Sequence, residues 1–131
     1  MITKILDRLY VGDAFFTKED LKRLGIGYVI NVGGNPNGLE NFDFHLADNG
    51  TNEEWQIKRI MGVLGEHMAQ GDRVLVCCRA GTSRSCFIIA VWLESMGMDL
   101  DEAVAFIKLK HKPTQINQEL LRFWRNKNVV S

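Results

Sequence analysis

The segment that decides the fold, residues 74–85, reads Val-Leu-Val-Cys-Cys-Arg-Ala-Gly-Thr-Ser-Arg-Ser, and an apolar run continues over residues 86–93. Its β-branched start predicts a short strand, its glycine and small polar residues predict a tight loop, and the run that is apolar on every side predicts a buried helix. A loop that leads into a helix in this way points successive backbone N–H groups at one place, where the helix dipole adds positive charge. The segment therefore predicts an anion-binding site.

Three side chains make this predicted anion site a candidate for covalent chemistry. Cys78 stands at the entrance of the loop, and Arg84 stands at the start of the helix. A helix N-terminus favours the thiolate, which is the nucleophilic form of cysteine, and a guanidinium can hold two oxygens of a phosphate at once. Ser85 adds a hydroxyl beside the sulfur. The competing interpretation is that Cys78 is a small buried apolar residue, as free cysteines usually are.

Outside this segment, hydrophobic periodicity and capping residues predict strands that alternate with helices. Strands are expected over residues 2–5, 8–11, 28–32 and 42–46. Further helices are expected from the cap Thr17 to Gly25, from a capping box of Thr51 with Glu54 to Gly71, from the cap Asp99 to Pro113, and around Leu120, Leu121 and Trp124. This alternation predicts an α/β fold whose central, mostly parallel sheet of about five strands is flanked by helices, with the loop at the carboxyl end of a central strand.

The pattern Cys-x5-Arg-Ser from Cys78 to Ser85 resembles the phosphate-binding loop of the cysteine-dependent protein phosphatases. The longer run is similar to the dual-specificity protein phosphatase family, whose loop reads His-Cys-x-x-Gly-x-Ser-Arg-Ser, with Cys77 in place of the histidine. Residues 9–12, 24–32 and 112–117 are similar to other segments of that family, so the resemblance covers nearly the whole chain. It implies the single-domain fold of the dual-specificity phosphatases over residues 1–131.

The resemblance also implies roles for individual residues. Cys78 would be the nucleophile, and the Ser85 hydroxyl would assist departure of its sulfur. The residues expected to bind the phosphate are those of the loop: Arg79, Ala80, Gly81, Thr82, Ser83 and Arg84. In the family, an asparagine after the proline helps to brace the loop, so Asn117 is a candidate support residue; an ordinary helix cap explains it equally well.

Cleavage of a phosphate ester by a thiolate also needs a general acid that protonates the departing oxygen. Asp48 is the candidate, because it follows a predicted strand, precedes Asn-Gly and lies thirty residues before Cys78, close to where the family carries its acid. The alternative for Asp48 is a turn aspartate that bonds its own backbone. Asp43 is the second choice, but it lies within the strand pattern.

Composition narrows the class of protein further. The chain has 131 residues, with 16 Lys and Arg against 16 Asp and Glu, so no net charge favours a nucleic acid or a membrane as partner. Its three cysteines match neither a disulfide framework nor a zinc site, and no run is long enough to span a bilayer. We therefore expect no metal and no cofactor, a reducing compartment and a cytoplasmic location; the sequence does not decide the oligomeric state.

The function expected from these observations is a metal-independent protein phosphatase that acts on phosphotyrosine and on phosphoserine or phosphothreonine through a phosphocysteine intermediate. Its partners would be phosphorylated proteins. The alternatives are a catalytically weak phosphopeptide-binding module and a phosphatase for a non-protein ester, such as phosphorylated RNA or carbohydrate. A redox pair of Cys77 with Cys78 is disfavoured, because adjacent Cα atoms are about 3.8 Å apart and disulfides want about 4.4–6.8 Å.

Cys77 is the one departure from the loop pattern of the family. Alternation along the strand points the side chains of Cys77 and Cys78 to opposite faces of the sheet, so Cys77 should lie behind the loop. The histidine at this position in the family hydrogen-bonds behind the loop. A thiol is a weaker hydrogen-bonding group, so we expect Cys78 to form its thiolate somewhat less readily than in relatives with histidine.

Overall fold

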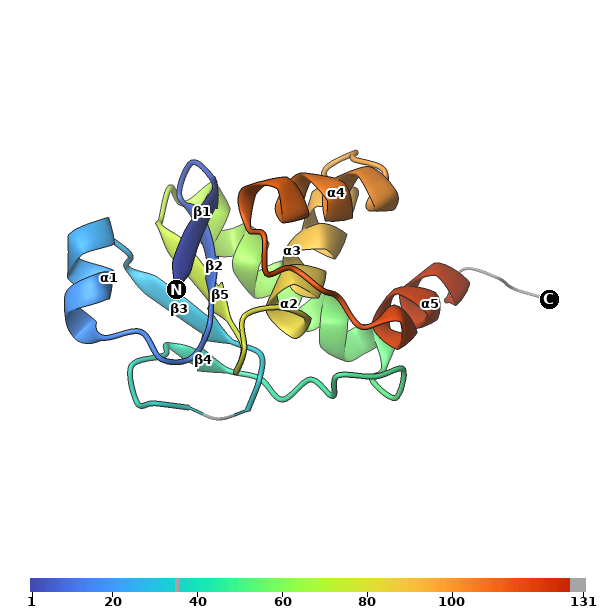
Figure 1. The fold of residues 1–131 in the computed structure, drawn as a ribbon, viewed down its shortest axis with the longest axis horizontal. Coiled ribbons are helices and arrows are strands. Elements are labelled where there is room, and N and C mark those ends of the chain that lie inside the picture. Colours follow the sequence, from blue (N-terminus) through green and yellow to red (C-terminus); the bar gives the residue numbers. More distant parts are fainter. Residues whose placement is uncertain (35, 128–131) are drawn as a thin grey trace.

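A central five-stranded sheet organises the molecule in a computed structural model, which describes residues 1–34 and 36–127 (Figure 1). The strands lie in the order β1-β2-β5-β3-β4. Their bounds are Ile2–Leu6 for β1, Leu9–Gly12 for β2, Tyr28–Asn31 for β3, Phe42–Asp43 for β4 and Val74–Cys77 for β5. The helices are Lys18–Leu24 (α1), Glu54–Ala69 (α2), Arg84–Ser95 (α3), Leu100–Lys110 (α4) and Gln118–Asn126 (α5).

The register of the sheet brings three loops to one edge. β1 pairs antiparallel with β2, whereas β2, β5, β3 and β4 run parallel to one another. Gly12 and Asn31, the last residues of β2 and β3, both pair with Cys77 at the end of β5. The loop that follows β5 therefore starts between the loops that follow its two neighbours, at the carboxyl edge of the sheet where open α/β folds bind ligands.

The two faces of the sheet are covered differently. Figure 1 shows α1 on one side, with α2, α3, α4 and α5 on the other. Alternation along β5 places Cys77 in a small core on the α1 side, together with Tyr10 and Val29. Cys78 belongs to the large core on the opposite side, which is built around helix α3, whose residues 85–93 are all buried. The expectation that Cys77 lies behind the phosphate loop is thus confirmed.

The predicted fold class is confirmed: this is a single α/β domain with a mostly parallel five-stranded sheet. Predicted caps are present at Thr17, whose hydroxyl accepts from the Asp20 N–H, and at Asp99, whose carboxylate accepts from the N–H groups of Asp101 and Glu102. No helix within residues 1–34 and 36–127 has the length and apolar character needed to cross a bilayer.

The sequence prediction is wrong at the ends of several strands. The strand expected over residues 42–46 ends at Asp43, and an isolated bridge between His45 and Gly33 replaces its remainder. The first strand extends one residue beyond the predicted Ile5, and the second covers Leu9–Gly12 instead of residues 8–11. Arg8 is excluded from the second strand because it lies in the turn with Asp7 and has a φ of 70°.

The capping box predicted for Thr51 and Glu54 is also wrong. The box is made two residues later along the chain, by Glu53 with Gln56, and α2 starts at Glu54. The Thr51 hydroxyl instead donates to the Asn49 side chain at 2.6 Å, within the loop that precedes the helix. The Thr51 hydroxyl, which the sequence pattern assigned to the helix cap, is thus used for a side-chain hydrogen bond within the loop.

Candidate active site

Cys78 lies at the bottom of the loop between β5 and α3, where its side chain is 2% exposed. Its sulfur is 3.1 Å from the Ser85 hydroxyl, which comes from the first turn of α3. Gly33 packs against Cys78 so closely that a Cβ there would lie 2.8 Å from the Arg79 nitrogen and 2.9 Å from the Cys78 Cα. The approach of these two loops therefore requires glycine at position 33.

The backbone of the phosphate loop, residues 79–83, has its carbonyl groups bound from outside. Three of them accept hydrogen bonds from other parts of the chain: Arg79 from the Ala14 N–H, Gly81 from His111 Nε2 and Thr82 from the Gln115 N–H. The N–H groups of residues 79–83 donate no hydrogen bond within the described ranges 1–34 and 36–127. In a trans peptide the C=O and the next N–H point in opposite directions, so carbonyls held outward direct amides inward. The loop thus forms a concave set of free donors, an arrangement that suits an anion.

Arg84 brings a positive charge to the same place. Its guanidinium donates from Nη1 to the carbonyl oxygens of Gly33 and Leu46, both at 3.1 Å. No carboxylate of the described residues forms an ion pair with it. Two neutral carbonyls therefore fix the position of the guanidinium without cancelling its charge, and its other nitrogens remain available for an anion.

Asp48 is fastened to the phosphate loop by hydrogen bonds. The Ser83 hydroxyl donates to Asp48 Oδ1 at 2.6 Å, and that same hydroxyl accepts from the Asn117 N–H at 2.9 Å. The Asn117 side-chain amide donates to the Asp48 carbonyl oxygen at 2.6 Å. The exposed carboxylate of Asp48 is therefore held at the edge of the loop that begins at Cys78.

The second candidate acid, Asp43, lies elsewhere. It belongs to β4, and its carboxylate is 3.5 Å from the ring of His45. In register it pairs with Asn31, which separates it from Cys77 by one whole strand. Asp43 makes no side-chain contact with the phosphate loop among the described residues, in contrast to Asp48.

Asn117 has both of the roles between which the sequence did not decide: it caps a helix, and it holds the loop residues. Its side-chain oxygen accepts from the Glu119 N–H and caps α5, while its side-chain nitrogen and its backbone N–H hold Asp48 and Ser83. A helix cap uses only the oxygen of asparagine, so the amide nitrogen is free for the second task.

The other two cysteines stay away from the anion site. Both are fully buried, and burial raises the pKa of the Cys77 thiol above its ordinary value and that of the Cys86 thiol to about 11. Neutral thiols are poor nucleophiles, which leaves Cys78 as the candidate. Within residues 1–34 and 36–127 no group of His, Cys, Asp or Glu side chains is arranged to hold a metal ion. Metal independence stays a prediction.

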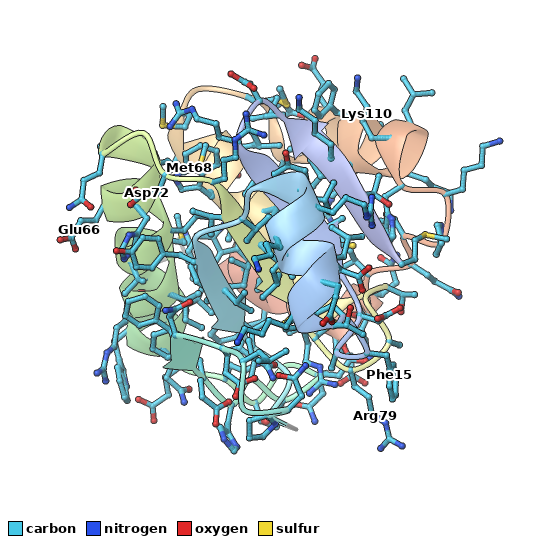
Figure 2. All side chains as sticks on the ribbon, turned by 90° about the vertical axis from the view of Figure 1, so that its left-hand side faces the viewer. Phe15, Glu66, Met68, Asp72, Arg79 and Lys110 are labelled. Atoms are coloured by element: carbon cyan, nitrogen blue, oxygen red, sulfur yellow. The ribbon has the colours of Figure 1, made fainter. Side chains whose placement is uncertain are left out.

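An open cavity of about 340 Å³ adjoins the loop on its solvent side, lined by Ala14, Phe15, Asn37 and Arg79. Phe15 is 76% exposed, and Figure 2 shows it beside Arg79 at one corner of the molecule, where both side chains project into solvent. An aromatic ring and a guanidinium thus stand at the rim of the anion site. Sequence reasoning included Arg79 among the binding residues and did not identify Phe15.

Several residues that build the site were also missed from the sequence. The carbonyls of Gly33 and Leu46 hold Arg84, and His111 holds Gly81. The Gly33-Gly34 pair directly after a buried strand was the available signal for a close backbone approach. A carbonyl acceptor leaves no signal of its own in a sequence, because every residue has one.

Comparison with known proteins places this constellation in a family. The model of the family described as "Dual specificity phosphatase, catalytic domain" matches residues 9–127. The chain belongs to this dual-specificity phosphatase family. Dual specificity protein phosphatase 9 of Homo sapiens is 33% identical over 118 residues, which cover 82% of this chain and 31% of that protein.

Two further relatives extend the comparison. Dual specificity protein phosphatase 16 of Homo sapiens is 35% identical over 125 residues, covering 86% of this chain and 18% of that protein. The chain thus spans less than a third of the length of either curated relative. Among solved structures, the human tyrosine phosphatase-like serine/threonine/tyrosine-interacting protein superposes with a TM-score of 0.83 at 20% identity, covering 98% of this chain and 95% of that one. This structural likeness supports the fold alone.

Proposed function

We propose that this dual-specificity phosphatase domain is an active, metal-independent protein phosphatase that hydrolyses phosphotyrosine, phosphoserine and phosphothreonine through a phosphocysteine intermediate. One observation carries the proposal. The Cys78 sulfur lies beneath free backbone donors and beside the Ser85 hydroxyl, while Asp48 is held at the edge of the same loop. This arrangement supports the action of a nucleophile, an oxyanion-binding loop and a general acid in one site.

In the first step, the Cys78 thiolate attacks phosphorus in line with the ester oxygen. The loop N–H groups and Arg84 hold the three non-bridging oxygens, on which negative charge gathers in the transition state. The P–S bond forms as the P–O ester bond breaks, and the Asp48 carboxyl group gives its proton to the departing alkoxide or phenoxide. The products are the free hydroxyl of the substrate and phosphocysteine.

In the second step, Asp48, now a carboxylate, takes a proton from water as the water oxygen attacks phosphorus. The P–S bond breaks, inorganic phosphate forms, and Cys78 leaves as a thiolate. The Ser85 hydroxyl, 3.1 Å from the sulfur, donates a hydrogen bond to this leaving thiolate. Asp48 ends the cycle protonated and ready for the next substrate.

The substrate class follows from the open surroundings of the site. The cavity at the rim is bounded by Phe15 and Arg79 and stays open to solvent, so both short and long phosphorylated side chains have access. Arg79 suits acidic groups near the phosphorylated residue, and Phe15 suits the ring of phosphotyrosine. Phosphorylated proteins are therefore the proposed partners. The three cysteines are all free thiols, which fits a reducing, cytoplasmic setting.

The test is hydrolysis of para-nitrophenyl phosphate, followed by a panel of phosphotyrosine, phosphoserine and phosphothreonine peptides, each with and without a chelator. The parent should turn over all of them and ignore the chelator. Cys78→Ser should lose more than about a thousandfold in turnover, because the nucleophile is gone, and should still bind phosphate through the loop and Arg84. Full activity in Cys78→Ser would contradict the mechanism.

The same panel separates the alternatives. Phosphopeptide binding by a parent that shows no turnover would replace the enzyme with a binding module. Turnover of phosphorylated RNA or carbohydrate in preference to all peptides would move the substrate to a non-protein ester. Loss of activity on adding the chelator would contradict metal independence.

A further inference from the structure

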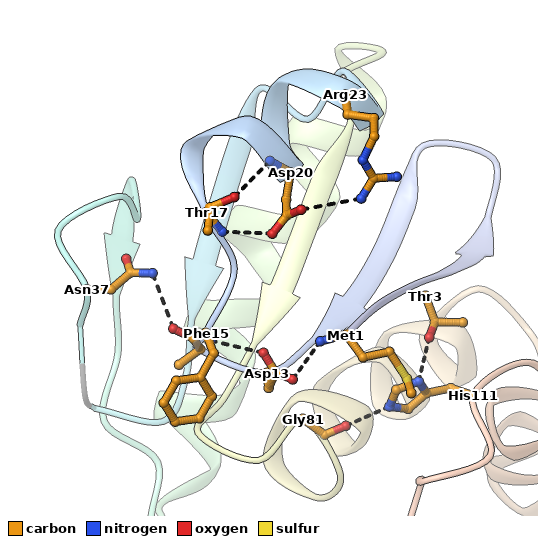
Figure 3. Close-up of polar contacts among 11 residues, drawn as sticks. Met1, Thr3, Asp13, Phe15, Thr17, Asp20, Arg23, Asn37, Gly81 and His111 are labelled. Carbon is orange, nitrogen blue, oxygen red and sulfur yellow. Dashed lines mark hydrogen bonds and ion pairs between the residues drawn. The ribbon is translucent and has the colours of Figure 1, made fainter.

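His111 is a buried histidine that the proposed chemistry does not use. It follows α4, is 3% exposed, and lies on the outer side of the phosphate loop. Figure 3 shows its imidazole between Thr3 of β1 and Gly81 of the loop. Nε2 is 2.8 Å from the Gly81 carbonyl oxygen, and Nδ1 is 2.7 Å from the Thr3 hydroxyl.

The chemistry of the two partners assigns the protons. A carbonyl oxygen only accepts, so His111 Nε2 must carry a hydrogen. In the neutral imidazole Nδ1 then accepts from the Thr3 hydroxyl, and both ring nitrogens are satisfied. Thr3 is itself fixed by its pairing with Val11 in the hairpin. The imidazole ring is thus fixed to the sheet through its hydrogen bond with Thr3, and it donates a hydrogen bond to the phosphate loop at Gly81.

Gly81 is the loop residue whose peptide orientation depends most on such a hydrogen bond. Its φ is 69°, and a Cβ there would lie 2.6 Å from both the Gly12 carbonyl carbon and the Asp13 nitrogen, so no other residue fits. Glycine also leaves the peptide unit between Gly81 and Thr82 free to rotate between alternative orientations. Besides His111, only the weak donor Cys86 reaches the Gly81 carbonyl among the described residues, at 3.7 Å.

We infer that His111 is a positioning residue of the phosphate loop: by holding the Gly81 carbonyl outward, it directs the Thr82 N–H into the anion site. Because a trans peptide is planar, the two groups point in opposite directions, and fixing one fixes the other. The Thr82 N–H donates no hydrogen bond to any of the residues that the structure describes. Without the Nε2–H bond, this peptide unit can turn, and the site loses a donor.

This role of His111 deepens the proposed function. Its effect on catalysis rests on that function, whereas its effect on anion binding does not, since anion binding can be measured without turnover. The test compares His111→Asn with His111→Gln. Asparagine places its amide near the position of Nδ1 and leaves Gly81 without a strong donor, whereas glutamine places an N–H near the position of Nε2. Leu100→Ala, which removes a buried side chain from the other end of α4, is the control for general destabilisation.

Affinity for inorganic phosphate is measured by calorimetry below the unfolding temperature of every variant, and kcat and KM are measured with para-nitrophenyl phosphate. His111→Asn should bind phosphate roughly tenfold more weakly, less than the effect of deleting an oxyanion donor outright. His111→Gln should recover most of the loss, and Leu100→Ala should bind like the parent. Parent-like phosphate affinity in His111→Asn would overturn the inference, as would an equal loss in Leu100→Ala.

If His111→Asn does not fold, the inference is tested by NMR of the parent protein. Nitrogen NMR should show His111 protonated at Nε2, and the Thr82 amide should shift when phosphate is added. An imidazole protonated at Nδ1 alone, or a Thr82 amide that ignores phosphate, would overturn the role. A parent that binds phosphate but hydrolyses no ester would contradict the proposed function only, and the comparison of the His111 variants would still be made on affinity.

Discussion

The phosphate loop and the loop between β4 and α2 that carries the candidate acid Asp48, here called the acid loop, meet in one site but are held in place by different means. The phosphate loop is anchored through its backbone carbonyls, which accept bonds from residues 14, 111 and 115. The acid loop reaches the site through side-chain bonds from Ser83 and Asn117 to Asp48. Anion binding should therefore survive most side-chain changes, whereas placement of the acid depends on two specific side chains. Binding and turnover can be separated by choosing which loop to disturb.

Among changes that keep Cys78, the largest expected effect comes from replacing the charged group beside the phosphate loop. Arg84→Lys should lower kcat/KM by roughly a hundred- to a thousandfold, because an ammonium cannot hold two phosphate oxygens and two carbonyls in one plane. The measurement is steady-state hydrolysis of para-nitrophenyl phosphate together with calorimetry of phosphate binding. Arg79→Lys, at the exposed rim, is the matched control and should change para-nitrophenyl phosphate hydrolysis little; equal losses in the two variants would refute a special role for Arg84.

Removal of the acid should separate turnover from binding. Asp48→Asn should slow phosphoserine and phosphothreonine hydrolysis by about a hundredfold and para-nitrophenyl phosphate hydrolysis much less, since nitrophenolate departs without a proton. Phosphate affinity should be unchanged. Asp43→Asn is the control, because that carboxylate contacts His45 and not the loop. A larger loss in Asp43→Asn, or equal losses on all substrates, would assign the acid elsewhere.

A smaller effect is expected from the two side chains that fasten Asp48. Ser83→Ala and Asn117→Asp each remove one bond to the acid loop, and Asn117→Asp keeps the oxygen that caps α5. Each should lower kcat for phosphoserine peptides about fivefold, which corresponds to about 1 kcal/mol for one hydrogen bond. Thr17→Ala, which removes the cap of the remote helix α1, controls for stability.

The double variants provide the decisive check on this fastening. If the bonds act only through the acid, Ser83→Ala should add little to Asp48→Asn, because the group being positioned is already absent. Fully additive losses would instead mean that Ser83 acts on the phosphate loop itself. Measurements of kcat on one phosphoserine peptide across the four variants of this cycle distinguish the two results.

The smallest expected effect concerns the residue behind the phosphate loop. Cys77→His should restore a hydrogen-bonding group and raise the rate of Cys78 alkylation by iodoacetate at mildly acidic pH by roughly twofold, because a thiolate is then better stabilised. The acidic limb of the pH–rate profile should move to lower pH with it. Cys77→Ala is the control without a donor. Slower alkylation in Cys77→His than in the parent would contradict the prediction.

Much of this architecture is encoded locally and was predictable. The strand, loop and helix around Cys78 follow from short-range patterns, and the caps Thr17 and Asp99 act within one turn of helix. The capping box at Thr51 failed for an equally local reason, since the hydroxyl of that residue bonds Asn49 instead. Local rules predict a cap well when the polar side chain has only one local hydrogen-bond partner available, and they fail when two partners compete for it.

The supports of the site were less accessible from sequence, because they join segments that are distant along the chain. Asn117 was recognisable from the family pattern, but its bond to Asp48 spans 69 positions. The contact between His111 and Gly81, and the fit of Gly33 against Cys78, depend on the sheet register. A single sequence carries no pairing information for such contacts, and backbone carbonyls are identical at every residue.

The anchoring of the phosphate loop links ligand binding to the free energy of unfolding. The contacts that turn its carbonyls outward come from the loop after β2, from the end of α4 and from the segment before α5, so the loop exists only when all of these are assembled. An anion that binds it binds the native state alone. Phosphate at a hundred times its dissociation constant would then stabilise the whole domain by about 2.7 kcal/mol. A phosphorylated substrate would likewise protect strands and helices far from the ester that it presents.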